Sequence, residues 1–243
     1  MISAIKLQGI INDQRHIPLL VKGGVSAVSD IKIGITGLPG SGKTYALLRV
    51  IDMLREEGIV VGGMINEPVD EAREASAEEP SEEVKEKNPG PRVSVKGKRK
   101  VGFTVRDLMT GECVQFASTD IESKVMVGKI GVDLNTFEQV GVKAIKNACR
   151  KAEEGVEPDF QECDLIVIDE VGKMEVESEA FVEAVKEALD AEKPMIITLH
   201  KKSRNPLLQD IRRRDDVRIL EVTPTNRNIL PYKVVRLING ENI

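Results

Sequence analysis

The stretch Ile31-Lys32-Ile33-Gly34-Ile35-Thr36-Gly37-Leu38-Pro39-Gly40-Ser41-Gly42-Lys43-Thr44 decides the fold of this chain. Its β-branched residues alternate at Ile31, Ile33 and Ile35, which is typical of a strand. The apolar residues of 45–54 recur with helical spacing, so we expect a helix there. Residues 37–44 fit G-x-x-x-x-G-K-[ST], the phosphate-binding loop, in its required setting between a strand and a helix. The chain is therefore predicted to bind a nucleotide.

The residue types in this loop follow from the chemistry of phosphate binding. Gly37, Gly40 and Gly42 let the backbone adopt conformations that side chains forbid, so that successive N–H groups point at phosphate oxygens. The positive end of the following helix adds to that attraction. We expect Lys43 to reach the β- and γ-phosphates and the Thr44 hydroxyl to bind Mg²⁺. The expected nucleotide-binding residues are Gly37, Leu38, Pro39, Gly40, Ser41, Gly42, Lys43, Thr44 and Tyr45.

A second apolar strand, over residues 164–169, ends in the two carboxylates of Asp169 and Glu170. Such a strand supplies the Asp that holds Mg²⁺ opposite the phosphate loop, usually through water, so Asp169 is the expected metal-side residue. The Glu170 side chain should point another way, toward the γ-phosphate, where a carboxylate can orient or deprotonate the attacking water. The alternative is a pair of strand-end acids that cap the next turn. The phosphate loop in the same chain favours the functional role.

Two further side chains are candidate catalytic helpers. Thr198 and His200 end a predicted strand, and ligands of open parallel sheets bind beyond the carboxyl ends of the strands. His200 can sense the γ-phosphate, or it can be a strand-end histidine that the backbone satisfies. Lys173 can neutralise transition-state charge as an arginine finger does, or it can be a surface lysine paired with Glu175 or Glu177. The sequence leaves both alternatives open.

Composition limits the class of protein. The 243 residues suffice for one α/β core with an insertion. A net charge of -5 argues against a chain built mainly to hold nucleic acid, although local basic patches leave that partner open. The three cysteines, Cys113, Cys149 and Cys163, form neither a disulfide framework nor a zinc-ligand pattern, which fits a reducing compartment. With no membrane-length apolar stretch and no signal-peptide pattern, we expect a cytoplasmic monomer without a membrane partner.

The chain divides into an extension over residues 1–30, whose role the sequence does not reveal, and a nucleotide-binding domain over 31–243. Inside the domain, residues 67–91 are rich in acids and proline and poor in large apolar residues, so we expect a mobile insertion there. A regulatory or docking loop is the alternative. The basic cluster that follows can be a solvated hairpin edge or can screen triphosphate charge; it comprises Arg92, Lys96, Lys98, Arg99 and Lys100.

Strands and helices alternate along the domain, which predicts a mostly parallel sheet covered by helices on both faces, with an inserted β-hairpin. We expect Asn135 to cap a helix that runs through Arg150 and Lys151. Its buried face should comprise Phe137, Val140, Ala144, Ile145 and Ala148. The other expected elements are a strand at 59–66, a hairpin at 101–116 with its turn at 109–112, a strand at 127–134, a helix at 178–190, a strand at 195–200, a helix at 206–213, a strand at 217–222 and a short helix from Thr225.

With these residues assembled, the chain resembles the small P-loop nucleoside-triphosphatases of archaea and bacteria, whose relatives include the so-called cancer-related nucleoside-triphosphatase. The resemblance covers about residues 31–232 in the family's order. The phosphate loop is generic, whereas Asp-Glu-Val-Gly-Lys-Met-Glu at 169–175, followed by Thr-Leu-His at 198–200, is much more specific. The other matching stretches are Val101-Gly102-Phe103, residues 127–133 and residues 222–227.

This resemblance implies a RecA-like α/β domain that hydrolyses ATP, GTP, CTP and UTP to diphosphate and phosphate with Mg²⁺. It also implies loose base choice and slow turnover. The chain departs from the family in three places. Residues 1–30 have no counterpart, the acidic segment 67–91 is longer than the usual connection, and Met126 stands where an Arg often precedes Val-Gly. An anion contact made by that Arg is therefore not expected here.

Two other functions stay open at the level of sequence. A nucleotide or small-molecule kinase needs an arginine-rich lid, for which Arg204, Arg212, Arg213 and Arg214 are candidates, although such a run is more typical of a solvated face. A water-activating Glu beside the γ-phosphate would be a liability in a kinase, so the Asp-Glu pair favours hydrolysis. A nucleotide-switched module that binds RNA or protein could use the basic cluster at 92–100.

Overall fold

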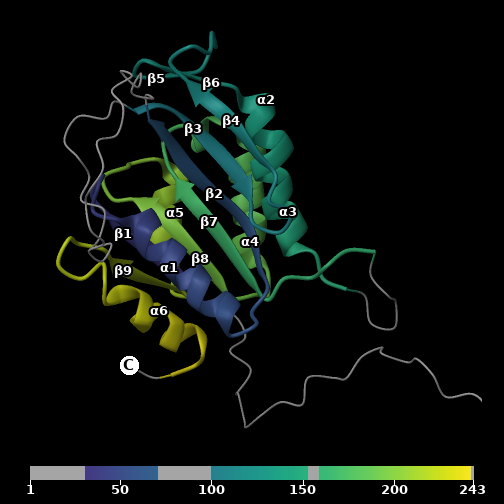
Figure 1. The fold of residues 1–243 in the computed structure, drawn as a ribbon, viewed down its shortest axis with the longest axis vertical. Coiled ribbons are helices and arrows are strands. Elements are labelled where there is room, and N and C mark those ends of the chain that lie inside the picture. Colours follow the sequence, from purple (N-terminus) through teal and green to yellow (C-terminus); the bar gives the residue numbers. More distant parts are fainter. Residues whose placement is uncertain (1–30, 71–99, 153–158, 242–243) are drawn as a thin grey trace, which may run out of the picture.

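The computed structural model describes residues 31–70, 100–152 and 159–241. Its sheet is mixed and has the strand order β5-β6-β4-β3-β2-β7-β8-β1-β9 (Figure 1). The strands are β1 (Lys32–Gly37), β2 (Val61–Asp70), β3 (Lys100–Asp107), β4 (Cys113–Ser118), β5 (Met126–Val127), β6 (Ile130–Val132), β7 (Leu165–Val171), β8 (Met195–His200) and β9 (Val217–Glu221). The helical segments are α1 (Lys43–Glu56), α2 (Leu134–Phe137), η1 (Glu138–Val142), α3 (Lys143–Cys149), η2 (Glu175–Glu177), α4 (Glu179–Asp190), α5 (Pro206–Arg213) and α6 (Leu230–Ile238).

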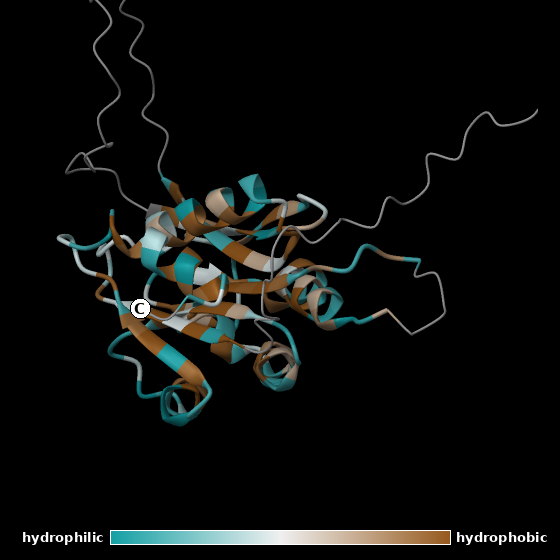
Figure 2. Cartoon of the chain, turned by 90° about the horizontal axis from the view of Figure 1, so that it is seen from below, coloured by the Kyte–Doolittle hydropathy of each residue, from teal (hydrophilic) through white to brown (hydrophobic). Residues whose placement is uncertain are grey.

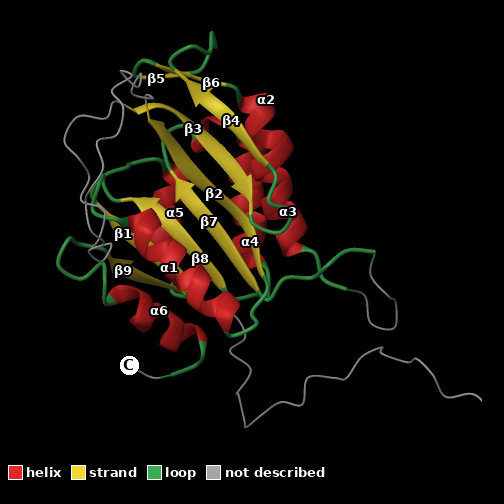
Figure 3. Cartoon of the chain, in the orientation of Figure 1, coloured by secondary structure: helices red, strands yellow, loops and turns green. Residues whose placement is uncertain are grey.

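Helices cover both faces of this sheet (Figure 3). Helices α1 and α6 pack over one hydrophobic cluster, and α3, α4 and α5 pack over a second cluster on the opposite face. In the hydropathy colouring, apolar residues gather in the strands and hydrophilic residues lie on the outer parts of the helices (Figure 2). The predicted three-layer α/β architecture is confirmed. Within the described ranges, no helix combines the length and apolar character needed to cross a bilayer.

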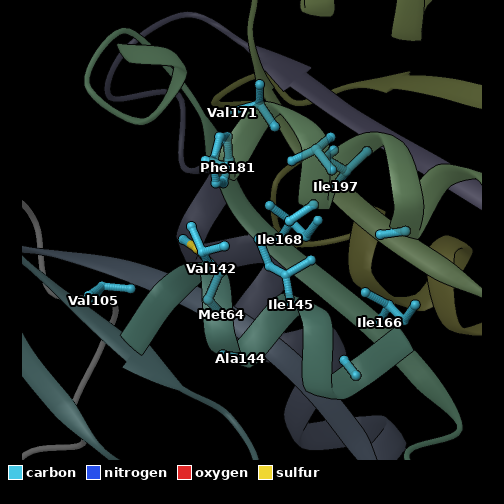
Figure 4. Packing of buried hydrophobic residues seen from close by; sticks show 14 of the residues in the cluster. Met64, Val105, Val142, Ala144, Ile145, Ile166, Ile168, Val171, Phe181 and Ile197 are labelled. Carbon is cyan, nitrogen blue, oxygen red and sulfur yellow. The ribbon is translucent and has the colours of Figure 1, made fainter. Parts of the chain in front are cut away.

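The parallel half of the sheet positions the predicted site. Strands β2, β7, β8, β1 and β9 pair in parallel, and Gly37 lies opposite His200 at the carboxyl end of the β1–β8 pair. Strand β7 is buried on both faces, because Leu165 and Val167 belong to one cluster while Ile166 and Ile168 belong to the other. Figure 4 shows Ile166 and Ile168 in the second of these clusters. That double burial explains its unbroken apolar run.

The antiparallel half departs from expectation at one strand. Strands β3 and β4 pair as the expected hairpin, and β3 lies against β2. The continuous strand expected at 127–134 is wrong, because the chain reverses between β5 and β6, which pair with each other. Gly128 has φ 67 at that reversal, a conformation that glycine adopts without steric cost. Residues 67–70 also extend β2, so the segment expected to form an insertion from residue 67 begins as strand.

The helix after β6 begins earlier and ends earlier than expected. Asp133, rather than Asn135, is its cap: the Asp133 carboxylate accepts hydrogen bonds from the Thr136 amide at 3.0 Å and the Thr136 hydroxyl at 2.7 Å. A π-helical segment, η1, interrupts it, and it ends at Cys149 because Arg150 is extended. The five residues expected on its buried face are all buried.

The last helix starts five residues later than expected. Residues 224–229 form turns rather than helix, and α6 begins at Leu230 with Pro231 in its first turn. Asn226 holds the turn, since its Oδ1 accepts a hydrogen bond from the Thr223 amide at 2.8 Å and its Nδ2 donates to the Glu221 carbonyl. Asn side chains that bond nearby backbone favour turns over helix. The extension 1–30, most of the acidic insertion and the basic residues 92–99 lie outside the described residues.

Candidate active site

The phosphate loop has the backbone that its sequence predicted. Gly40 and Gly42 have φ values of 76° and 97°, and Gly42 is the N-cap of α1. A Cβ on Gly37 would lie 2.4 Å from the Ser41 Oγ and 2.8 Å from the Val222 carbonyl oxygen, so only glycine fits there. No side chain caps the N-terminus of α1, and no acidic residue lies in its first turn. Its amides are therefore available to an anion, as phosphate binding requires.

Lys43 and Glu170 face each other across the centre of the site. Lys43 is buried at the start of α1, and its Nζ lies 3.3 Å from the Glu170 Oε2. The Glu170 side chain, from β7, keeps 27% exposure and lines a cavity of about 420 Å³ beside the phosphate loop. The structure thus brings the expected phosphate-binding cation and the expected base into contact.

Asp169 is fully buried next to this pair and is held by two hydroxyls. Thr44 donates to its Oδ2 at 2.9 Å, and Thr198 on β8 donates to its Oδ1. Burial raises the Asp169 pKa to about 6; the Glu170 charge adds to the rise, while both hydroxyl bonds and the Lys43 charge oppose it. Thr198 was expected to face the nucleotide, but its position beside the metal-side carboxylate is visible only in the structure.

The oxygens of Thr44 and Asp169 fit Mg²⁺, which prefers hard oxygen ligands. Within the described ranges, no three His, Cys, Asp or Glu side chains gather in a way that could hold a metal ion. A Mg²⁺ ion at Thr44 and Asp169 would therefore complete its coordination with phosphate oxygens and water, as Mg²⁺ commonly does in nucleotide sites.

The two candidate helpers line the same cavity. Lys173 is exposed there, and among the described residues it forms no ion pair with Glu175 or Glu177. The His200 Nδ1 is buried and has no hydrogen-bond partner in the part of the chain that the structure describes. The alternative roles, a paired surface lysine and a histidine whose Nδ1 the backbone satisfies, are therefore not observed. Tyr45 lines the cavity with 44% exposure, at its rim.

Two residues that line the cavity were not predicted as site residues. Asn66, on β2, donates from its Nδ2 to the Glu175 Oε1 at 2.7 Å, and both side chains are buried. Asn66 directly follows the part of β2 that pairs in parallel with β7, and the carboxyl ends of parallel pairs are where ligands bind in such sheets. Glu175 belongs to the specific 169–175 motif, but nothing in the sequence distinguished it from an exposed acid.

Two of the four arginines considered for a kinase lid have other partners. Arg212 donates to the backbone carbonyls of His200, Lys201 and Ser203, which ties α5 to the end of β8. Arg214 pairs with Asp190 and Asp216 and donates to the Leu189 carbonyl. These two guanidinium groups hold the fold together rather than face a nucleotide, which leaves Arg204 and Arg213 as the exposed arginines of that set.

Comparison with known proteins agrees with this geometry. The sequence model of the family described as NTPase matches residues 32–77 and 90–235. The nucleoside-triphosphatase THEP1 of Thermoplasma volcanium is 36% identical over 87% of this chain and 98% of its own length. The THEP1 protein of Picrophilus torridus is 34% identical over 87% of this chain and 97% of its own length.

Two solved structures share the fold. The crystal structure of THEP1 from the hyperthermophile Aquifex aeolicus has a TM-score of 0.63 and 27% identity, covering 86% of this chain and 99% of that one. The solution structure of a human cancer-related nucleoside triphosphatase has a TM-score of 0.62 and 28% identity, covering 87% of this chain and 99% of that one. Sequence motif, site geometry and these relatives agree, and the chain belongs to the NTPase family of P-loop nucleoside-triphosphatases.

Proposed function

We propose that this protein hydrolyses nucleoside triphosphates to diphosphate and phosphate with Mg²⁺, and that Glu170 is the general base. The observation that carries the proposal is the Glu170 carboxylate, which lies 3.3 Å from the Lys43 Nζ and opens into the cavity. Because the P-loop lysine reaches the β- and γ-phosphates, a carboxylate in contact with it lies within reach of a water at the γ-phosphorus.

The roles of the remaining residues follow from their positions. The amides of the phosphate loop and Lys43 bind the phosphates, while Thr44 and Asp169 would hold Mg²⁺. When bound there, Mg²⁺ would supply positive charge that offsets the negative charge developing on the phosphates. Lys173 and His200 line the cavity where they can stabilise the γ-phosphate as charge builds on it.

The reaction balances with water as the only second reactant. The water oxygen attacks the γ-phosphorus, its proton passes to Glu170, and the bond from that phosphorus to the β–γ bridging oxygen breaks. The diphosphate leaves from the loop and the proton returns to solvent as phosphate departs.

Tyr45 gives a reason to expect broad base use. It directly follows Thr44, lines the cavity and keeps 44% of its surface exposed. Every base has a π-face, so stacking on an aromatic ring is tolerant of base identity. We therefore infer that ATP, GTP, CTP and UTP are all substrates.

The test is phosphate release from these four nucleotides with Mg²⁺ by the wild type and three variants. Lys43→Ala should lower kcat/KM by about 10³-fold because it removes the main phosphate cation. Glu170→Gln should keep nucleotide binding but lose about 10² to 10⁴-fold in kcat, the usual contribution of a general base. Glu177→Gln is the matched control, since this exposed acid lies on η2 near the same motif.

Each outcome bears on a separate part of the proposal. Wild-type turnover by Glu170→Gln would remove Glu170 from the role of base. Nucleotide binding without release by the wild type would contradict hydrolysis altogether.

A further inference from the structure

Glu175 is a buried acid that has no positive partner in the part of the chain that the structure describes. It begins η2 and retains 3% exposure, and the amide of Asn66 donates to its Oε1 at 2.7 Å. No ion pair involving Glu175 occurs among the described residues. An ionised carboxylate buried without a cation is costly, whereas a protonated one bonded to an amide is not.

Gly172 shows how close Glu175 comes to Glu170. A Cβ placed on Gly172 would lie 2.7 Å from the Glu175 Oε2 and 3.5 Å from the Glu170 Oε1. The two carboxyl groups therefore flank the same glycine. A side chain at position 172 would crowd the Glu175 carboxyl, which would have to move.

The charges around Glu175 are mainly negative. The pKa of Glu175 is raised to about 8. Burial is the largest cause of this rise; the charges of Glu170 and Asp169 add to it, and backbone hydrogen bonds oppose it. The cations that line the same cavity are not bound to it: Lys43 contacts Glu170, and Lys173 is exposed. His200, at the end of β8, and Tyr45, after the phosphate loop, are the remaining titratable groups lining the cavity within the described ranges.

We propose that Glu175 acts as a neutral carboxylic acid, fixed by Asn66, that positions the Glu170 carboxylate and keeps a further negative charge away from it. This rests on the proposed function, since it assumes that Glu170 takes a proton from water. Glu175 is then a positioning residue, which acts through Glu170. Its ionisation would add a third carboxylate charge to those of Asp169 and Glu170, which already raise its pKa, and like charges repel.

The decisive comparison is between Glu175→Gln and Glu175→Ala. Glutamine has the shape of a protonated Glu and cannot ionise, so Glu175→Gln should keep kcat within about threefold at pH 7. It should also retain activity above pH 8, where the wild type declines. Glu175→Ala should lose about tenfold or more in kcat with little change in KM, because Glu170 loses its support.

A structural readout accompanies the kinetics. In the wild type, Glu175 binds its proton more tightly when folded than when unfolded, so its contribution to stability falls as pH rises from its ordinary value toward about 8. Thermal unfolding of Glu175→Gln should lack this component, and the variant should gain relative to the wild type as pH rises. This measurement also shows whether Glu175→Ala folds.

Two results would overturn the inference. A Glu175→Gln variant as inactive as Glu170→Gln would mean that the ionised acid is required. An unchanged alkaline decline in Glu175→Gln would mean that ionisation of Glu175 does not limit activity. Failure of the proposed function looks different, because it would appear as full turnover by Glu170→Gln whatever residue occupies position 175.

Discussion

Two buried carboxyl groups that line the active-site cavity, Asp169 beside the phosphate loop and Glu175 on η2, have opposite surroundings. At the phosphate end, Asp169 accepts hydrogen bonds from two hydroxyls and lies near Lys43, all of which favour its charged form. Glu175, on η2, accepts from an amide and has no cationic partner within the described ranges, and the charges that act on it from Asp169 and Glu170 are both negative. Similar burial therefore leaves one acid ready to bind a cation and the other protonated at neutral pH. The difference shows that partners, rather than depth, assign the roles of acids in this site.

The substitution Gly172→Ala should have the largest effect on this arrangement, because Gly172 lies next to both Glu175 and Glu170. The added Cβ would lie 2.7 Å from the Glu175 Oε2 and 3.3 Å from the Glu170 Cγ, so the Glu175 carboxyl must move and Glu170 is crowded. We expect kcat to fall by about 100-fold, the usual cost of misplacing a catalytic group by about 1 Å. Phosphate release with ATP measures it.

The double variant Gly172→Ala/Glu175→Ala is the control for that prediction. Removing the Glu175 carboxyl also removes the clash with the added Cβ. The loss of kcat in the double variant should therefore be smaller than the product of the losses in the two single variants. Fully additive losses would mean that Gly172 acts independently of Glu175.

Thr198→Val tests the phosphate end. Valine keeps the shape of threonine but removes the hydrogen bond to the Asp169 Oδ1, so the charged carboxylate loses support. We expect the apparent Mg²⁺ affinity to fall about thirtyfold, within the usual range for the partner of a metal ligand. The Mg²⁺ dependence of phosphate release measures it. Thr198→Ser should behave like the wild type, and equal Mg²⁺ affinity in the valine variant would contradict the assigned role.

Lower pH should weaken Mg²⁺ binding at this same end. The Asp169 pKa is raised to about 6, and a metal ligand must be deprotonated. Below that pH the apparent Mg²⁺ affinity should therefore fall about tenfold per pH unit, whereas above it the affinity should level off. Titration of Mg²⁺ into the nucleotide-bound protein from pH 5 to pH 8 measures the change. An affinity that is flat across this range would remove Asp169 as a ligand.

The smallest expected effect lies at the rim, where Tyr45 is partly exposed. Tyr45→Ala should raise KM about fivefold for all four nucleotides, the lower end of what base stacking contributes. Inorganic tripolyphosphate carries no base, so its hydrolysis should be the same in variant and wild type. A rise in KM for tripolyphosphate would assign Tyr45 to the phosphates instead.

The sequence alone predicted the chemistry that depends on local order. Gly40, Gly42 and Lys43 act within a single loop, so their spacing was sufficient to predict phosphate binding and its backbone geometry. The buried strand that contains Asp169 and Glu170 could also be predicted from its sequence, because a strand buried on both faces requires an unbroken apolar run. The local pattern gave wrong helix starts where a side chain binds nearby backbone amides. Asn226 holds a turn where a helix was expected, and Asp133 caps the helix in place of Asn135.

Only the tertiary structure decided which residues share the cavity and in what charge state. Asn66, Thr198 and Glu175 come from β2, β8 and η2, and their contacts with one another or with Asp169 span 29 residues or more along the chain. Sheet order brings them together, and sheet order depends on the packing of both faces rather than on any local pattern. An acid's charge state depends on the partners that this packing supplies, which is why Asp169 and Glu175 could be read as acids from sequence but assigned opposite roles only in the fold.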